Sequence, residues 1–250
     1  MFISTVPSSP TPKPISKVWY PNRTFLPELT WGRRLFRIFT KLLCKVVVFF
    51  FTSATITGTE NYPTDGPALV VINHLGDPDV IIALAALQGV PEVIGSIHLR
   101  EIPWLRFWMD LFGVIWVHRG RPDRQVISSV LKAFHQGRFI IIAPEAREST
   151  SGALEEGTNG AAYLALKGGV PIIPVTITGS EFRRIEKNLV KFRRTQISVT
   201  VGKPFFISQQ VNFKDSLHVG TGAIMETLAR QLPPEYRGFY AYVGETAKKF

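Results

Sequence analysis

The chain of 250 residues contains one cysteine, Cys44. A single thiol cannot form an internal disulfide or a cysteine-based metal site, and its place in an apolar run predicts a buried or membrane-facing group rather than a nucleophile. The first twenty residues contain proline and serine but no hydrophobic block, so no secretory signal is visible. These absences indicate a reduced, cytosolic compartment.

The sequence also lacks a hydrophobic run long enough to cross a bilayer. The uncharged stretch 46–59 is shorter than the ~20 residues of a span and is polar at its end. Residues 29–44 instead place apolar side chains near helical spacing, and the basic side chains gather on the other side: Arg33, Arg34, Arg37 and Lys41. This pattern is typical of a helix in a membrane interface. We therefore expect residues 29–54 to attach the protein, as a peripheral or monotopic protein, to the cytoplasmic face of a membrane. The alternative is an ordinary amphipathic helix packed on the core.

Several chemical signatures are missing as well. The chain has no Gly-x-Ser-x-Gly nucleophile elbow and no glycine-rich phosphate loop. Its five histidines form no cluster with carboxylates at metal-ligand spacing, so we expect no metal. No cofactor signature is present either.

Positive charge is abundant and unevenly distributed. The formal net charge is +10, and residues 1–60 hold eight Lys/Arg against two acidic residues. Residues 181–194 hold six Lys/Arg against two acidic residues, interleaved with aromatic and aliphatic side chains. Such a segment could stack on single-stranded nucleic acid, lie on anionic lipid or form a solvated charged hairpin. The amphipathic segment before it favours a membrane surface with anionic lipids, and we expect no nucleic-acid partner.

The order of apolar segments predicts the fold class. Residues 1–28 are expected to be disordered or extended, and residues 55–250 to form one domain. Strands are expected at 68–72, 93–97, 114–117, 139–143, 171–176 and 196–201, and helices at 79–88, 122–136 and 158–167. This alternation predicts an α/β fold with a largely parallel, partly mixed central sheet of six or seven strands and helices on both faces. Residues after about 205 carry no signal that we can interpret.

The most informative element is Asn73-His74, which follows the strand at 68–72, with Asp79 five residues after His74. Asp77 is placed to cap the next helix, with Pro78 in its first position. On one continuous helix His74 and Asp79 would diverge by roughly 140°, but across a strand-to-helix turn they can meet. A carboxylate that accepts one imidazole N–H leaves the other nitrogen free to take a proton from a hydroxyl. Asp77 could be the partner instead, and a purely structural pair is also possible.

Four blocks in fixed order resemble the glycerolipid acyltransferase family, which contains the lysophosphatidate acyltransferases. They are NHLGDPD at 73–79, GVIWVHRG at 113–120, APEARES at 143–149 and GVPIIPV at 169–175. The resemblance covers roughly residues 55–205. It implies that His74 is the general base and Asp79 its orienting partner, with Asn73 beside them in contact with substrate.

The resemblance also implies substrate-binding roles. Arg119 and Arg147 would clamp a phosphate, Glu145 would bind glycerol hydroxyls or orient a basic residue, and Pro171 would shape the acyl-donor pocket. The third block departs from the usual Phe-Pro-Glu-Gly-Thr-Arg-Ser. Aligned without a gap, Ala146 replaces the glycine and Glu148 the arginine, whereas an alignment with one deletion keeps Arg147 as the family arginine.

The resemblance implies a membrane-associated O-acyltransferase. It would move a fatty acyl group from acyl-coenzyme A or acyl carrier protein to a lysophospholipid, with lysophosphatidate as the first choice. The alternatives are another lyso-lipid or glycolipid acceptor, or a non-catalytic membrane- or nucleic-acid-binding protein on the same fold.

Overall fold

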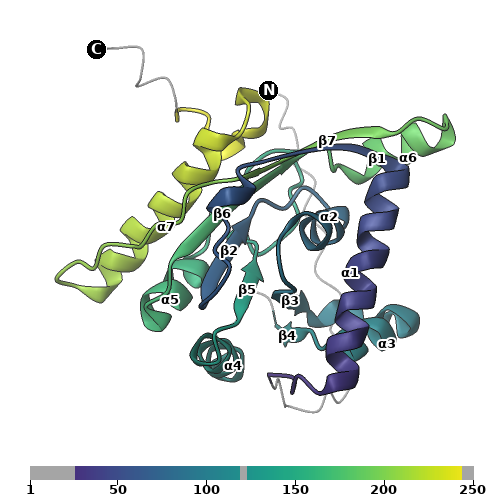
Figure 1. Cartoon of the computed structure of the whole chain (residues 1–250). Helices are drawn as coiled ribbons and strands as arrows, with labels where there is room; N and C mark the ends of the chain where they lie inside the picture. The colour runs from purple at the N-terminus through teal and green to yellow at the C-terminus, as the bar shows by residue number, and fades with distance from the viewer. Residues whose placement is uncertain (1–25, 119–122, 244–250) are drawn as a thin grey trace, which may run out of the picture.

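The computed structural model describes residues 26–118 and 123–243. At its centre is a seven-stranded sheet with strand order β1-β7-β6-β2-β5-β3-β4 (Figure 1). The strands are β1 (Thr52–Thr57), β2 (Ala68–Ile72), β3 (Glu92–Ser96), β4 (Ile115–Val117), β5 (Phe139–Ile142), β6 (Ile172–Thr178) and β7 (Thr195–Val201). All neighbouring pairs are parallel except β6 and β7, which are antiparallel. The predicted largely parallel, partly mixed sheet is confirmed.

Helices cover both faces of this sheet (Figure 1). They are α1 (Trp31–Phe51), α2 (Pro78–Ala86), α3 (Pro103–Phe112), α4 (Arg124–His135), α5 (Asn159–Gly168), α6 (Phe182–Val190) and α7 (Phe213–Gln231). Leu69 and Val71 of β2 face a core that α4, α5 and α7 complete, while Val70 and Ile72 face a second core with α2. A strand buried on both faces reads as an unbroken apolar run, which is why β2 was visible in the sequence.

Four elements were not predicted. Strand β1 has five exposed residues out of six, and the expected boundary between residues 54 and 55 falls in its middle. Helices α3 and α7 had no clear signal. The basic segment 181–194 forms helix α6 and a turn, so the hairpin, the third of the options for this segment, is wrong. The expectation for residues 1–25 lies outside the described residues.

Helix α1 turns its polar side toward the protein and its apolar side outward. Arg37 is buried, and Lys41 donates hydrogen bonds to the carbonyl oxygens of Leu87 and Gly89. Cys44 is also buried against α2 and α3, as one of its two predicted environments required. The exposed side carries Trp31, Leu35, Ile38, Phe39, Leu42, Leu43, Val46, Phe49 and Phe50. An ordinary helix that hides its apolar face in the core is therefore excluded.

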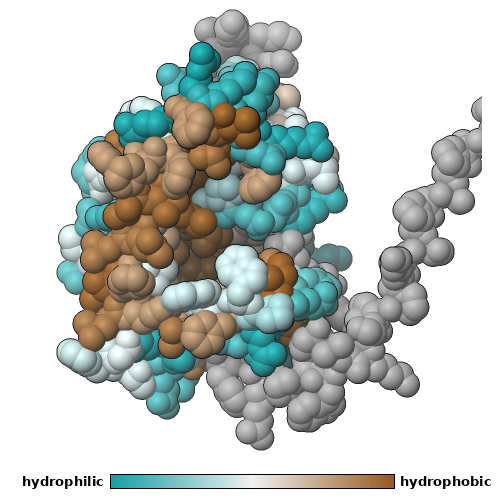
Figure 2. Space-filling view, turned by 90° about the vertical axis from the view of Figure 1, so that its right-hand side faces the viewer, coloured by the Kyte–Doolittle hydropathy of each residue, from teal (hydrophilic) through white to brown (hydrophobic). Residues whose placement is uncertain are grey.

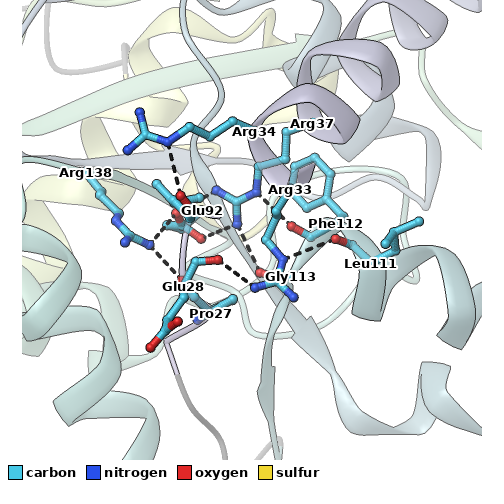
Figure 3. Close-up of polar contacts among 11 residues, drawn as sticks. Pro27, Glu28, Arg33, Arg34, Arg37, Glu92, Leu111, Phe112, Gly113 and Arg138 are labelled. Atoms are coloured by element: carbon cyan, nitrogen blue, oxygen red, sulfur yellow. Dashed lines mark hydrogen bonds and ion pairs between the residues drawn. The ribbon is translucent and has the colours of Figure 1, made fainter. Parts of the chain in front are cut away.

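A buried ion network fastens α1 to the sheet (Figure 3). The two guanidinium Nη atoms of Arg37 each lie 2.7 Å from a carboxylate oxygen of Glu92. Arg138 donates to the same carboxylate at 3.1 Å. Arg37 also donates to the carbonyl oxygens of Phe112 and Gly113 at the end of α3. These bonds fix the position of α1 and keep its apolar side pointing outward.

Exposed side chains of α3 extend this apolar side. Trp104, Phe107, Trp108 and Leu111 are all more than two fifths exposed, and Trp108 stacks on Phe36 of α1 with ring centroids 5.6 Å apart. Figure 2 looks onto this side of the molecule and shows a broad, continuous hydrophobic area. We call the exposed apolar residues of α1 and α3 the apolar face. Among the described helices, none is long and apolar enough to cross a membrane.

Candidate active site

His74 and Asp79 meet across the turn between β2 and α2. The Nδ1 atom of His74 lies 3.1 Å from Oδ2 of Asp79, and the Asp79 side chain is fully buried. The same oxygen accepts the backbone N–H groups of Leu75 and Gly76 at 2.6 and 2.9 Å. The carboxylate therefore shapes the turn and positions the imidazole at the same time.

This geometry fixes the tautomer of His74. A carboxylate only accepts hydrogen bonds, so Nδ1 is the protonated nitrogen and Nε2 is the one able to take a proton. The alternative partner, Asp77, occupies the N-cap position of α2, but its side chain makes no capping hydrogen bond. Its predicted capping role is therefore wrong, and Asp79 organises the turn in its place.

Asn73 ties this turn to the neighbouring strand. Its side-chain Nδ2 donates to the carbonyl oxygen of Ile177 at 2.8 Å, and its Oδ1 accepts the N–H of the same residue at 2.7 Å. The pair continues the β2–β6 ladder by one residue beyond Ile72, where the strand ends. Asn73 thus holds His74 at the carboxyl end of the sheet, and its contact with substrate stays a prediction.

Glu145, which follows β5, lies beside His74. Its Oε1 accepts the backbone N–H of His74 at 3.0 Å, and its Oε2 accepts that of Glu155 at 2.7 Å. The residue is 3% exposed. Burial raises the pKa of Glu145 to about 7, although the two N–H donors act to lower it. Glu145 joins the histidine turn to the loop 143–158, and its role toward a glycerol hydroxyl stays a prediction.

The backbone conformation of the third block, residues 143–149, helps to choose between its two alignments with the family. Ala146 has φ 57°, in the left-handed region that glycine adopts without steric cost. This conformation favours the ungapped alignment, in which Ala146 occupies the glycine position. Glu148 then stands where the family has arginine, and Arg147 stands at the threonine position.

Arg147 is nevertheless close to the site. Its guanidinium forms an ion pair with the carboxylate of Glu155 while the Arg147 side chain is 61% exposed. Hydrogen bonds from Thr150, together with Arg147, lower the pKa of Glu155 to about 2. Because an exposed arginine exchanges partners readily, a phosphate could compete with Glu155 for this guanidinium.

Two predicted site residues remain, Arg119 and Pro171. Arg119 lies outside the described residues. Pro171 precedes β6, and its carbonyl oxygen accepts the N–H of Leu69 near the start of β2. The β2–β6 register, extended by two residues, places Ile177 beside His74. Pro171 precedes Ile177 by six residues, so at ~3.3 Å per residue it is about 20 Å from His74, toward the amino ends of these strands. Its role in an acyl-donor pocket stays a prediction.

Two residues of the site were not predicted. The N–H of Ser149 donates to the carbonyl oxygen of His74 at 2.8 Å. Glu155 accepts hydrogen bonds from the N–H and hydroxyl of Thr150, which closes the loop beneath Arg147. No pattern in the sequence marks Glu155, because its partners are loop residues that only the folded chain brings together.

The assembled site suits proton transfer from a hydroxyl. The His74 side chain is buried except for 11% of its surface, and Asp79 holds its Nδ1 atom. Such a pair is the usual arrangement of a general base and its orienting group. Within the described residues, no group of three or more His, Cys, Asp or Glu side chains could hold a metal ion.

Comparison with known sequences gives one consistent answer. The model of the Acyltransferase family matches residues 53–178. The chloroplastic 1-acyl-sn-glycerol-3-phosphate acyltransferase BAT2 of Brassica napus is 28% identical over 153 residues, covering 60% of this chain and 44% of that protein. The 1-acyl-sn-glycerol-3-phosphate acyltransferase of Borreliella burgdorferi is 32% identical over 125 residues, covering 49% of this chain and 50% of that protein. The chain spans about half the length of the curated relatives it matches.

A solved structure has the same fold. The crystal structure of the 1-acyl-sn-glycerophosphate (LPA) acyltransferase, PlsC, from Thermotoga maritima superposes with a TM-score of 0.61 at 19% identity, covering 87% of this chain and 82% of that one. The matched family region contains His74, Asp79 and Glu145 and runs from β1 to the end of β6. On this evidence the chain belongs to the Acyltransferase family.

Proposed function

We propose that the protein is a membrane-associated O-acyltransferase that moves a fatty acyl group from an acyl thioester to lysophosphatidate, giving phosphatidate. The observation that supports this most directly is the buried Asp79–His74 pair at the strand end, inside the matched family region. The names of the sequence relatives agree with this acceptor.

In the proposed reaction, Nε2 of His74 removes the proton of the acceptor hydroxyl as its oxygen attacks the thioester carbonyl. The C–S bond then breaks, the acceptor oxygen keeps the acyl group, and the proton passes to the leaving thiolate. Asp79 stabilises the transient imidazolium. General-base help of this kind contributes ~10²–10⁴ in rate. No acyl-enzyme is needed.

The apolar face supports the membrane location. Both substrates carry fatty acyl chains, so an enzyme at the bilayer surface meets them where they are most concentrated. Trp31, Trp104 and Trp108 are the side-chain type enriched at the membrane–water interface. We propose that the apolar face lies in the headgroup region, as a peripheral or monotopic attachment at the cytoplasmic face.

A second acceptor class has specific support. In the ungapped alignment Glu148 occupies the arginine position, and Arg147 is paired with Glu155. A carboxylate near the acceptor would repel a phosphate monoester. This favours a lyso-lipid or glycolipid whose headgroup carries less negative charge.

A panel of acceptors separates the two possibilities. Thiol release from a long-chain acyl-coenzyme A would be measured in mixed micelles with lysophosphatidate, lysophosphatidylcholine, lysophosphatidylethanolamine or a monoacylated glycolipid. A kcat/KM at least tenfold higher for lysophosphatidate supports the first proposal. A higher value for a zwitterionic or neutral acceptor supports the second. Repeating the panel with acyl carrier protein identifies the donor.

A further inference from the structure

A pocket of about 370 Å³ opens beside the last turns of α1, away from the His74 network, by which we mean the hydrogen-bonded residues His74, Asp79 and Glu145. It lies between α1, α2 and the strands β1 and β7, and none of its lining residues belongs to that network. Most of its lining is apolar: Val48, Phe49, Ala54, Ile56, Ile82 and Val199. Its volume is within the ~300–1,000 Å³ of small-molecule sites. The lining suits a hydrocarbon chain.

Two cations belong to the same lining, Lys45 and Arg194. The Nε of Arg194 donates to the carbonyl oxygen of Thr52 at 2.7 Å, and its guanidinium carbon lies 5.3 Å from the ring centroid of Phe49. These contacts hold the guanidinium in place. In the part of the chain that the structure describes, neither Lys45 nor Arg194 forms an ion pair with a carboxylate. The charge of the pocket is therefore complementary to an anion.

The pocket adjoins the apolar face. Phe49 lines the pocket and is 65% exposed, and its neighbours Val46 and Phe50 are exposed on the same helix. Ile56, on the other side of the pocket, belongs to the exposed edge strand β1. A molecule in this pocket can therefore keep part of its hydrocarbon in the bilayer. Of the anions available at such a surface, a phospholipid supplies both a chain and a phosphate.

We propose that this pocket binds one anionic glycerophospholipid of the bilayer, with its phosphate between Lys45 and Arg194 and a chain along Val48, Ile82 and Val199. The site would hold the protein in one orientation on anionic membranes. The proposal rests on the membrane location proposed above, but it does not depend on acyl transfer.

The test is calorimetric titration of the whole protein with dioctanoyl phosphatidylglycerol below its critical micelle concentration. One lipid per chain is expected, with at least tenfold weaker binding of dioctanoyl phosphatidylcholine. The double variant Lys45→Gln/Arg194→Gln should lose at least tenfold in affinity. The control Lys132→Gln/Arg230→Gln removes the same charge from α4 and α7 and should bind as the wild type does.

Two further variants separate the pocket from general charge and from the active site. Ala54→Trp places a large side chain in the pocket from an exposed strand position. This variant should bind the lipid at least tenfold more weakly, although both cations remain. His74→Ala should keep the full affinity for the lipid. The binding result can therefore be interpreted even if the protein shows no acyl transfer. Equal binding by all variants overturns the proposal. So does one-for-one displacement of the lipid by an acyl-coenzyme A, or equal competition by inorganic phosphate.

Discussion

His74, Asp79 and Glu145 share one buried set of hydrogen bonds, in which each carboxylate also accepts backbone N–H groups. The sequence predicted the first two from a strand end and a helix start, because both signals are local. It placed Glu145 at a strand end as well. That Glu145 would bond to the N–H of His74 depends on β2 and β5 being neighbours, which no local pattern reveals.

Asp79→Asn should lower kcat about 10²–10⁴-fold, because a neutral amide cannot stabilise the imidazolium as a carboxylate does. The measurement is acyl transfer at saturating substrates. The matched control is Asp77→Asn, since the Asp77 side chain makes no capping hydrogen bond and should keep nearly full activity. Equal losses in the two variants would contradict the assignment of Asp79.

The raised pKa of Glu145 predicts that the stability of the protein depends on pH. Its pKa rises from 4.5 to about 7 on folding, so the folded chain binds more protons than the unfolded chain between these values. The free energy of unfolding should therefore fall as pH rises from 4.5 to 7, by about 3 kcal/mol when complete. Because the pKa of Glu155 is lowered on folding, its contribution makes the free energy of unfolding rise with pH, but only below pH 4.5.

The measurement is urea unfolding of the wild type and Glu145→Gln from pH 5 to 7.5. The variant should show a flatter profile, although it is less stable at low pH because an amide N–H faces a backbone donor. Glu156→Gln, at an exposed neighbour, should follow the wild type. A wild-type profile as flat as that of Glu145→Gln would contradict the assigned pKa.

At the scale of elements, α1 is the part that the sequence explains least completely. Its helical period and apolar stripe were visible, and so was its basic side. The sequence does not show that the basic side chains of α1 would form bonds inside the protein, since their partner Glu92 and the neighbouring Arg138 come from distant segments. Strand β1 was missed because it is an exposed edge whose residues show no buried alternation.

Glu92→Gln should destabilise the protein by about 3–5 kcal/mol, because it leaves Arg37 buried without its counter-charge. Urea unfolding at constant pH gives the value. Glu226→Gln removes a carboxylate from an exposed ion pair with Arg230 and should cost less than about 1 kcal/mol. Similar small effects in both variants would show that the network does not fasten α1.

At the scale of the whole molecule, the alternation of strands and helices predicted the layered fold. It also predicted that the site lies at the carboxyl ends of the strands. The apolar face is a property of the folded chain. Half of it was visible as the stripe on residues 29–44, but α3 comes from a separate segment. It meets α1 only in the folded chain, through the Phe36–Trp108 stack and the hydrogen bonds from Arg37 to the end of α3.

Phe39→Ser/Phe107→Ser should weaken binding to phospholipid vesicles about tenfold or more, since each phenylalanine contributes roughly 1.5–3 kcal/mol when fully buried. Both residues are more than half exposed, so folding should be unaffected. Phe206→Ser/Phe239→Ser removes two similarly exposed phenylalanines outside α1 and α3 and should bind normally. Co-sedimentation measures both, and equal binding by the two variants would exclude the apolar face as the docking surface.

The central claim is that His74 is the base of an acyl transfer from a thioester to a lyso-lipid. The most direct measurement is thiol release from a long-chain acyl-coenzyme A with lysophosphatidate in mixed micelles, for the wild type and His74→Ala side by side. Matching circular dichroism spectra would establish that both proteins are folded. We predict release that requires the acceptor and is lost in His74→Ala. Equal release by the two proteins would contradict the claim.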